Sequence, residues 1–475
     1  MSDNFHEKCG IFGIYSKNAA SDVTAHVYHA LFALQHRGQE SCGIAVCSEG
    51  LIQHYNDTGL VPDVFTKDTL DKLGKGGMAI GHVRYSTTGQ KNRENAQPIV
   101  VRHIKGSMAI AHNGSVTNAA ALREKLEREG ALFHTTNDTE IILHVITKKR
   151  IQTSSIETAI EQAMHDIQGA YSLVIMSPSK LIAVRDPQGF RPLCMGKLHG
   201  DFIFASESCA LDSIGADFIR DIEPGEIVVI DKDGDRSIKT HCGKQSGLCV
   251  FEYIYFARPD SVIEGASVHN ARQRAGSFLA LEHPVQADVV IGVPDSGLDA
   301  ALGFSRQSGI PYGFGFVKNR YIGRTFIQPS QEERDRSVRI KLNTIEATVK
   351  NKRVVLIDDS IVRGTTMRRI VNLLRETGAK EVHLRISSPP FINPCYFGTD
   401  IDSRENLIAC KMSIPEIREF LEADSLGYLS VDHVTKIAEN AKCGFCYGCF
   451  SGKYPVPEPA PAPKNKFEFK IGELG

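Results

Sequence analysis

A cysteine at position 9 stands directly before a short apolar stretch, CGIFGIY. Most free cysteines are small buried hydrophobes, and Cys9 could be one of them. Removal of residues 1–8 as a propeptide would instead make Cys9 the first residue, with a free α-amino group beside its thiol. The reference pKa values of amine and thiol are about 8 and about 8.5, so the amine could act as the base for the thiol. The placement therefore indicates an N-terminal nucleophile.

The other groups that such a nucleophile needs to attack a glutamine amide could come from four residues in later segments of the chain. Arg84 could bind the α-carboxylate through two parallel hydrogen bonds, and Asp138 could bind the α-ammonium group. The side chain of Asn113 and the N–H of Gly114 could form an oxyanion hole. Each has an ordinary alternative, because Arg84 could be a surface ion pair, Asn113-Gly114 a hairpin turn and Asp138 a helix N-cap.

A second group of residues that could bind a ligand follows a buried apolar run in VVLIDDSIVRGTT. Ligands of open parallel sheets gather beyond the carboxyl ends of the strands, where Asp358 and Asp359 would lie. The loop after them leads into a helix whose first N–H groups suit a phosphate, and Gly364 permits close approach. The two carboxylates would repel a phosphate but accept sugar hydroxyls or a divalent cation. The pattern predicts a phosphorylated-sugar site, with a helix cap beside solvated acids as the alternative.

The elements that must position these residues differ between the two halves of the chain. The first half has a helical pattern over residues 22–38 and several short apolar runs closed by polar turns, which indicates packed sheets. The second half has continuous apolar runs followed by a helical face over residues 367–377, a βαβ pattern typical of a parallel sheet. We place the boundary within residues 235–250.

Size, charge and cysteine content limit the function classes. A chain of 475 residues can form two to four domains, and its formal net charge of -1 favours neither nucleic acid nor a membrane surface as partner. No apolar stretch approaches the ~20 residues that span a bilayer, so we expect a soluble cytoplasmic protein. Twelve cysteines in so long a chain do not indicate a disulfide scaffold, and the cluster CGFCYGC suggests metal binding.

The second-half motif resembles the phosphoribosyl-pyrophosphate motif of type I phosphoribosyltransferases. The resemblance implies that Asp358 and Asp359 hold the ribose hydroxyls. GVPDSG resembles the diphosphate loop of that family, with Asp295 and Ser296 near a Mg²⁺-bound diphosphate, and KNRYIGRTF resembles the flexible lid. Tyr321 and Arg324 would cover the substrate from the lid, and Lys341 would offer a further cation for the diphosphate. The residues that the resemblance implies for the 5′-phosphate are Ser360, Arg363, Gly364, Thr365 and Thr366.

The first-half motifs CGIFG, LQHRGQES, GHVRYSTTG and HNG resemble those of class II, N-terminal-nucleophile glutamine amidotransferases. Together with the phosphoribosyl motif, they make residues 9–455 similar to the glutamine phosphoribosylpyrophosphate amidotransferase family. The resemblance implies a four-layer αββα glutaminase domain followed by an α/β phosphoribosyltransferase domain. The expected division is a propeptide, a glutaminase domain, a transferase domain and a proline-rich tail: residues 1–8, 9–240, 241–455 and 456–475.

The resemblance also implies an activity. Cys9 would hydrolyse glutamine through a thioester, and the ammonia would pass to the second site and displace diphosphate from phosphoribosyl pyrophosphate, with Mg²⁺ bound by Ser296, Asp358 and Asp359. The product, phosphoribosylamine, opens purine synthesis. The family further implies purine-nucleotide inhibitors and a homotetramer. The alternatives are another class II amidotransferase, which would carry a different synthase domain, and a catalytically inactive regulator.

Spacing alone does not choose between zinc and iron–sulfur for the cysteine cluster, since both accept four thiolates. The resemblance is to the subgroup of the family with a [4Fe-4S] cluster, and it implies Cys249, Cys395, Cys446 and Cys449 as ligands. Cys443 is then a spare thiol, or the ligand register is shifted. The six others are expected to be ordinary residues: Cys42, Cys47, Cys194, Cys209, Cys242 and Cys410.

Overall fold

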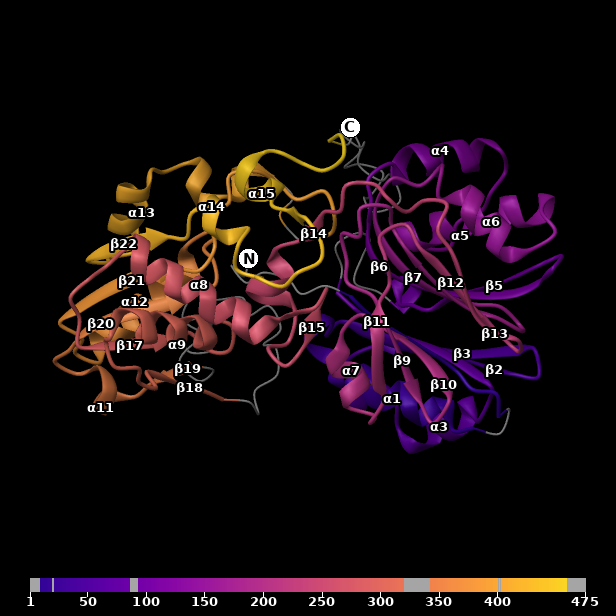
Figure 1. The fold of residues 1–475 in the computed structure, drawn as a ribbon, viewed down its shortest axis with the longest axis horizontal. Helices are drawn as coiled ribbons and strands as arrows, with labels where there is room; N and C mark the ends of the chain where they lie inside the picture. Colours follow the sequence, from indigo (N-terminus) through magenta and orange to yellow (C-terminus); the bar gives the residue numbers. More distant parts are fainter. Residues whose placement is uncertain are drawn as a thin grey trace, which may run out of the picture.

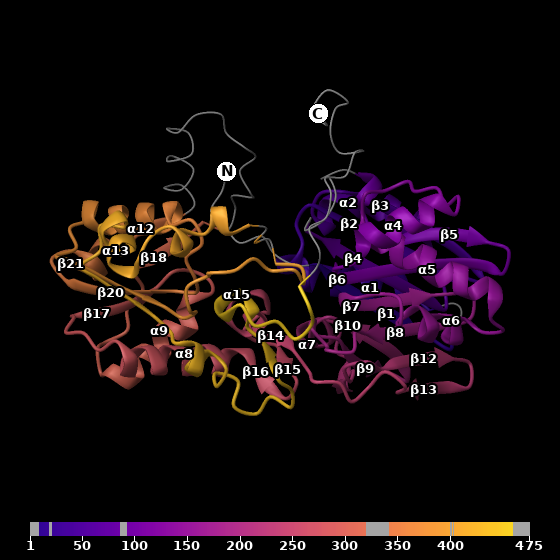
Figure 2. The ribbon, with the colours of Figure 1, turned by 90° about the horizontal axis from the view of Figure 1, so that it is seen from above.

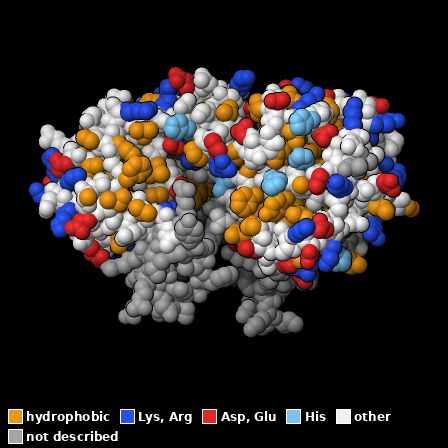
Figure 3. Space-filling model, turned by 90° about the horizontal axis from the view of Figure 1, so that it is seen from below, with side chains coloured by type: hydrophobic (Ala, Val, Ile, Leu, Met, Phe, Trp, Pro, Cys, Tyr) orange, Lys and Arg blue, Asp and Glu red, His pale blue; other side chains and the backbone are white. Residues whose placement is uncertain are grey.

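The structure is a computed structural model that describes residues 9–18, 21–85, 93–319, 342–399, 401 and 403–458. The N-terminal and C-terminal halves of the chain lie side by side (Figure 1). Seen from above, the last described segment runs back between the two halves (Figure 2). From below, the halves appear as two lobes with a hollow between them and hydrophobic side chains on both (Figure 3).

The N-terminal half contains two antiparallel sheets. The first has the order β11-β9-β10-β1-β4-β2-β3 and consists of β1 (Gly10–Tyr15), β2 (Ser41–Ser48), β3 (Leu51–Thr58), β4 (Met78–Arg84), β9 (Cys194–Leu198), β10 (Asp201–Ala205) and β11 (Asp217–Asp221). The second has the order β13-β12-β8-β7-β6-β5 and consists of β5 (Ile99–His103), β6 (Gly106–Val116), β7 (Gly169–Met176), β8 (Leu181–Arg185), β12 (Ile227–Asp231) and β13 (Gly234–Ile238).

Strand β1 shows why the sheets stack face to face. Its side chains alternate, so Ile11 and Tyr15 pack between the two sheets while Phe12 and Ile14 pack beneath helices. The helices over the first sheet are α1 (Val23–Ala33), α2 (Val61–Val64), α3 (Lys67–Leu73) and α7 (Ser208–Asp212). Those over the second are α4 (Ala119–Arg128), α5 (Asp138–Gln152) and α6 (Ile156–Ala163). The expected αββα layering is confirmed.

The predicted helix over residues 22–38 is shorter than the pattern suggested. Helix α1 ends at Ala33, and the 3-10 turn η1 (Gln35–Arg37) follows. The turn brings Arg37 into the interior, where its side chain is fully buried. Gly38 then packs so closely on the backbone of Arg84 that a Cβ atom would lie 2.6 Å from its nitrogen.

The C-terminal half is built on a parallel sheet with the order β17-β20-β21-β22, as the βαβ pattern predicts. Its strands are β17 (Val289–Gly292), β20 (Arg353–Asp358), β21 (Glu381–Ile386) and β22 (Ser425–Tyr428). Helices α8 (Val268–Glu282) and α9 (Gly297–Ser308) pack on one face, and α12 (Thr365–Glu376) and α13 (Ile414–Phe420) on the other. The predicted apolar face of α12 is buried: Met367, Ile370, Val371 and Leu374.

Smaller elements complete this half. Three short pairs are β14 (Leu248–Cys249) with β23 (Phe445–Cys446), β15 (Val262–Ile263) with β16 (Ala266–Ser267), and β18 (Phe316–Lys318) with β19 (Leu342–Thr344). Short helical elements are η3 (Glu252–Phe256), α11 (Glu346–Val349), α14 (Val431–Val434) and α15 (Gly448–Ser451). No helix within the described part of the chain combines the length and apolar character needed to cross a membrane.

Two candidate catalytic sites and a cysteine cluster

The predicted nucleophile lies at the start of the central strand β1. The thiol of Cys9 donates a hydrogen bond to the carbonyl oxygen of Tyr85, with 3.5 Å between sulfur and oxygen. Burial raises the pKa of this thiol to about 11, and the charge of Arg84 only partly opposes the shift. The thiol is therefore neutral near pH 7, and attack by its sulfur needs a base.

Two of the predicted glutamine-binding residues lie close to this thiol. Gly10 pairs with Val83 in the sheet, so Arg84, the last residue of β4, lies beside Cys9. Arg84 and Asp138 both influence the pKa of Cys9 electrostatically, and both side chains are buried. The alternative of a surface ion pair for Arg84 is therefore wrong.

Asp138 is the first residue of α5 but does not cap the helix. The N-cap is Asn137, whose side chain accepts a hydrogen bond from the N–H of Thr139 at 3.0 Å. Asp138 instead accepts from the N–H of Val116 at 3.0 Å and lies 3.6 Å from the His112 ring. Burial opposes its ionisation, but His112, the Val116 N–H and Arg84 together hold its pKa below the ordinary value. A negative charge is thus maintained near Cys9.

The predicted oxyanion donors lie within β6 and not in a hairpin turn. Asn113 and Gly114 pair with Ser172 and Tyr171 of β7. Asn113 is 1% exposed, and its Nδ2 has no hydrogen-bond partner among the described residues. This amide is therefore free to donate a hydrogen bond to a bound group. Gly114 has φ 147°, and a Cβ atom at this position would lie 2.1 Å from the carbonyl oxygen of Ala170.

The paired acids lie at the carboxyl end of β20, as predicted. Asp358 is its last residue, and Asp359 is buried. Burial is the main cause that raises the pKa of both carboxyl groups, and their mutual repulsion adds to the shift at Asp358. Hydrogen bonds from the hydroxyls of Ser296 and Ser360 partly oppose the shift at Asp359. The charge of Arg272 also opposes the shift at Asp359, but burial outweighs it.

The loop after the acids leads directly into α12. Gly364 is the N-cap of this helix, with φ 85°, and a Cβ atom there would lie 2.8 Å from Ile408. Thr365 is exposed at the first helical position, and Thr366 and Arg363 are partly exposed. The helix N-terminus is therefore accessible from the same end of the sheet as the two acids.

The predicted diphosphate loop meets the acids because β17 and β20 are parallel neighbours, with Gly292 opposite Ile357. Ser296 lies in the loop between β17 and α9 and donates its hydroxyl to Asp359. Asp295 forms an ion pair with Lys318. The remaining predicted residues of this site lie outside the described part of the chain: Tyr321, Arg324 and Lys341.

Four of the five candidate cysteines interact with one another. Cys249 lies opposite Cys446 in the β14–β23 pair. Burial raises the pKa of Cys449, and the charges of Cys395, Cys249 and Cys446 raise it further. The pKa of Cys249 is about 11, with burial as the main cause and Cys395 as a contributor. All of these cysteines are free thiols.

Cys443 stands apart from this group. Burial raises its pKa to about 12, but the charges that influence it are Glu264, Arg185 and Asp221 and not the other cysteines. Among the described residues, no set of three or more His, Cys, Asp or Glu side chains is arranged to hold a metal ion.

Several buried charged residues near these sites were not predicted from the sequence. Arg37 and Arg191 are buried and form ion pairs with the buried Glu252 of the second half. Arg37 also pairs with the buried Glu207 of its own half. The motif LQHRGQES contains Arg37, but only as part of a resemblance.

Domain comparisons agree with this two-site arrangement. A family model described as a glutamine amidotransferase domain matches residues 82–213, and one described as a phosphoribosyl transferase domain matches residues 269–387. Fold and domain matches together define a glutamine amidotransferase joined to a phosphoribosyltransferase.

Similar proteins cover nearly the whole chain. An amidophosphoribosyltransferase of Methanocaldococcus jannaschii is 50% identical over 464 residues, covering 94% of this chain and 98% of the relative. One of Bacillus subtilis is 46% identical over 456 residues, covering 95% and 94%. The solved Bacillus subtilis glutamine phosphoribosylpyrophosphate amidotransferase, complexed with ADP and GMP, matches with a TM-score of 0.87 at 45% identity, covering 94% of this chain and 97% of that one. The chain belongs to the amidophosphoribosyltransferase family.

The activity follows from this membership. Glutamine, water and 5-phosphoribosyl 1-pyrophosphate are converted to 5-phosphoribosylamine, glutamate and diphosphate, a step of purine biosynthesis. The alternative of a different class II amidotransferase is wrong, because the second domain is a phosphoribosyltransferase.

Proposed function

We propose that Cys9 is the nucleophile of glutamine hydrolysis and that Asn113 and Gly114 bind the oxyanion. The sulfur attacks the side-chain amide carbon, the amide nitrogen leaves as ammonia, and water then hydrolyses the thioester to glutamate. Arg84 holds the α-carboxylate of glutamine and Asp138 its α-ammonium group. The observation that carries this assignment is the buried, unpaired Nδ2 of Asn113 in a site that also contains the thiol.

We further propose that residues 1–8 are removed, so that the α-amine of Cys9 becomes the base. The raised pKa of the thiol supports this proposal, since a neutral thiol gains reactivity from an adjacent proton acceptor. An α-amine with a reference pKa of about 8 is half in the free-base form, which can accept a proton, at about pH 8.

At the second site, Asp358 and Asp359 are proposed to bind the ribose hydroxyls. The N-terminus of α12 and its preceding loop would hold the 5′-phosphate through N–H and hydroxyl donors. The residues proposed for this phosphate are Ser360, Arg363, Gly364, Thr365 and Thr366. The resemblance also suggests Asp295 beside the diphosphate, Tyr321 and Arg324 on a lid, and Lys341 as a further cation.

The acids also suit Mg²⁺. Two adjacent carboxyl groups that repel one another when ionised offer oxygen ligands of the kind that a divalent cation prefers. We propose Ser296, Asp358 and Asp359 as the residues that hold it. When bound, Mg²⁺ supplies positive charge that neutralises the diphosphate leaving group.

Ammonia from Cys9 is proposed to reach the second site without entering bulk water. The test compares glutamate and diphosphate released with glutamine as nitrogen source. One glutamate per diphosphate supports direct transfer. A large excess of glutamate over diphosphate at saturating phosphoribosyl pyrophosphate would contradict it.

The four interacting cysteines are proposed to bind a [4Fe-4S] cluster: Cys249, Cys395, Cys446 and Cys449. Burial, free thiols and mutual electrostatic influence suit a site for thiolate-bound metal. Four cysteine thiolates are the ligands that such a cluster needs. When bound, the cluster would hold distant segments together. Its role would be structural, because the reaction moves no electrons.

Wider properties are proposed from the family. The domain limits are residues 9–240 and 241–455, with a proline-rich tail over residues 456–475. ADP and GMP in the Bacillus subtilis structure support purine nucleotides as inhibitors. A homotetramer in the cytoplasm is the proposed state, which sedimentation of the purified protein would test.

A further inference from the structure

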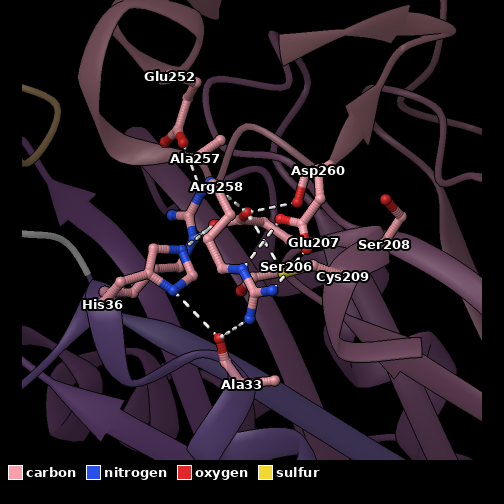
Figure 4. Close-up of polar contacts among 12 residues, drawn as sticks. Ala33, His36, Ser206, Glu207, Ser208, Cys209, Glu252, Ala257, Arg258 and Asp260 are labelled. Carbon is pink, nitrogen blue, oxygen red and sulfur yellow. Dashed lines mark hydrogen bonds and ion pairs between the residues drawn. The ribbon is translucent and has the colours of Figure 1, made fainter. Parts of the chain in front are cut away.

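Ser206 and Glu207 connect strand β10 to helix α7, which begins at Ser208, and the three residues lie at the boundary between the two halves (Figure 4). All three side chains are buried. Each of them bonds to a different segment, so we call residues 206–208 the junction.

Ser206 holds the strand that carries the predicted nucleophile. Its N–H donates to the carbonyl oxygen of Ile11 at 3.0 Å, and its hydroxyl accepts from the N–H of Ile11 at 3.0 Å. Ile11 is two residues after Cys9. These bonds therefore fix the start of β1 from the side of the junction.

Glu207 joins the first half to the second through its two carboxylate oxygens. Its Oε1 lies 2.8 Å from Nε2 of His36 and accepts a hydrogen bond from Nε of Arg37, both in η1. Its Oε2 accepts from the backbone N–H of Arg258 at 2.9 Å and from the hydroxyl of Ser261 at 2.7 Å. Burial opposes its ionisation, but Arg37 and His36 outweigh burial and hold its pKa well below the usual range.

The surrounding contacts reinforce the same connection. Ser208 accepts a hydrogen bond from the N–H of Val262 at 2.9 Å. Arg258 donates to the carbonyl oxygen of Ala33, at the end of α1, at 3.2 Å. Arg37 also pairs with Glu252 of the second half. Residues 252–262 are therefore bonded to the junction and to the turn beside it.

The same segment is bonded to Arg272 of α8. Its guanidinium donates to the carbonyl oxygens of Tyr253, Tyr255 and Ala257 at 2.9, 3.1 and 2.7 Å. Its pKa is lowered by burial and is influenced by the charges of Asp359 and Glu207. One buried cation thus lies within electrostatic range of both the paired acids and the junction.

We propose that Glu207 is a positioning residue for Cys9, and that residues 258–262 of the second half complete the support of the nucleophile strand. The rate of glutamine hydrolysis then depends on a segment of the transferase half that makes none of the proposed contacts with glutamine. This inference rests on the proposed role of Cys9, and its test uses the whole protein.

The test removes the hydrogen bond that Ser261 of the transferase half donates to the carboxylate of Glu207. Ser261→Ala is expected to lower kcat for glutamine hydrolysis about tenfold, because a hydrogen bond to a charged group is lost. The KM for glutamine should stay within about twofold, since Arg84 and Asp138 are untouched. Synthesis with added ammonia should also stay within about twofold of wild type, which shows that the transferase half remains folded.

Glu226 provides a matched control. It is also fully buried and paired with an arginine, Arg220, at 2.7 Å, but its partners lie within the first half. Glu207→Gln should lower kcat for hydrolysis more than Glu226→Gln does at equal loss of Tm. When Ser261→Ala is added to Glu207→Gln, it should lower kcat less than it does in the wild-type protein, since both substitutions alter the same hydrogen bond.

Three outcomes would overturn the inference. These are a folded Ser261→Ala variant with wild-type kcat for glutamine hydrolysis, a loss that appears only in KM, and an equal loss of kcat in Glu226→Gln. Failure of the proposed nucleophile is distinguishable, because Cys9→Ala would then retain glutamine hydrolysis whatever the state of the junction.

Discussion

Cys249 lies directly opposite Cys446 in the parallel pair of β14 and β23. The first follows the predicted domain boundary and the second lies near the end of the described chain. The loop with Cys395 is also held to the first half, where Phe397 stacks on Phe190 with 4.1 Å between ring centroids. The cysteine group thus lies where three distant segments meet.

The purified protein should contain iron if these cysteines bind a cluster. Anaerobic preparation is expected to yield a brown protein with about four iron atoms per chain. Oxygen should bleach it and lower the Tm, because loss of a buried metal group removes its contribution to folding. Metal analysis and absorbance measure both effects. A colourless, active protein that contains zinc and no iron would show that the assignment is wrong.

Two cysteines of the motif CGFCYGC provide a matched pair for this assignment. Cys446→Ser is expected to lose iron, whereas Cys443→Ser should keep it, since the described charges around Cys443 are Glu264, Arg185 and Asp221. Iron per chain after anaerobic purification is the measurement. The reverse result would mean that Cys443 is the ligand and Cys446 the spare.

Removal of the nucleophile should separate the two activities. Cys9→Ala is expected to abolish glutamine-dependent synthesis but to keep synthesis with added ammonia, because the acids lie in the other half of the chain. Diphosphate release with each nitrogen source measures the effect. Loss of both activities in a folded variant that keeps its Tm would contradict a two-site enzyme.

Alkylation of Cys9 should depend on pH in a way that reveals its base. With residues 1–8 attached, the reactive thiolate is gained as the pH rises towards the thiol pKa of about 11. In a chain that begins at Cys9, the α-amine accepts the proton and the rise should occur nearer pH 8. Mass spectrometry of the iodoacetamide-treated Cys9 peptide gives both curves. Identical curves for the two forms would exclude the amine as base.

Asn113→Ala tests the oxyanion hole. We expect kcat for glutamine hydrolysis to fall by about 10²–10³, because a donor to the developing negative charge is lost. The KM for glutamine should change little, since Arg84 and Asp138 hold the substrate backbone groups. Steady-state glutamate release measures both constants. A large rise in KM at constant kcat would assign Asn113 to binding instead.

Replacing Asp358 and Asp359 with Asn should stop synthesis with either nitrogen source by at least ~10²-fold, while glutamate release continues. Both pKa values are raised above those of the unfolded chain, so the folded protein binds the extra protons. The free energy of unfolding then falls as the pH rises from about 4 towards the raised values. The variant lacks this dependence, so without Mg²⁺ its Tm should exceed that of wild type more at pH 8 than at pH 5. An active variant would mean that the acids only support the loop.

The sequence by itself determined the features that depend on neighbouring residues. The alternation around Ile11 and the apolar face of α12 follow from the periods of strand and helix. Around Cys9 and from Asp358 to Gly364, the functional side chains and the residues that set the backbone conformation lie within a few positions of one another. Their motifs therefore predicted both sites and the order of the two domains.

Only the tertiary structure decided how residues far apart combine. Asn113 and Asp138 each had an ordinary local explanation, and it was long-range pairing that excluded a hairpin turn and a helix cap. The equal spacing of the three cysteines in CGFCYGC left their register open until β14 brought Cys249 beside Cys446. Glu207 carries no local signal at all, because a buried carboxylate is stabilised by partners from several segments. Such partners are chosen by packing across the chain, which sequence periodicity does not record.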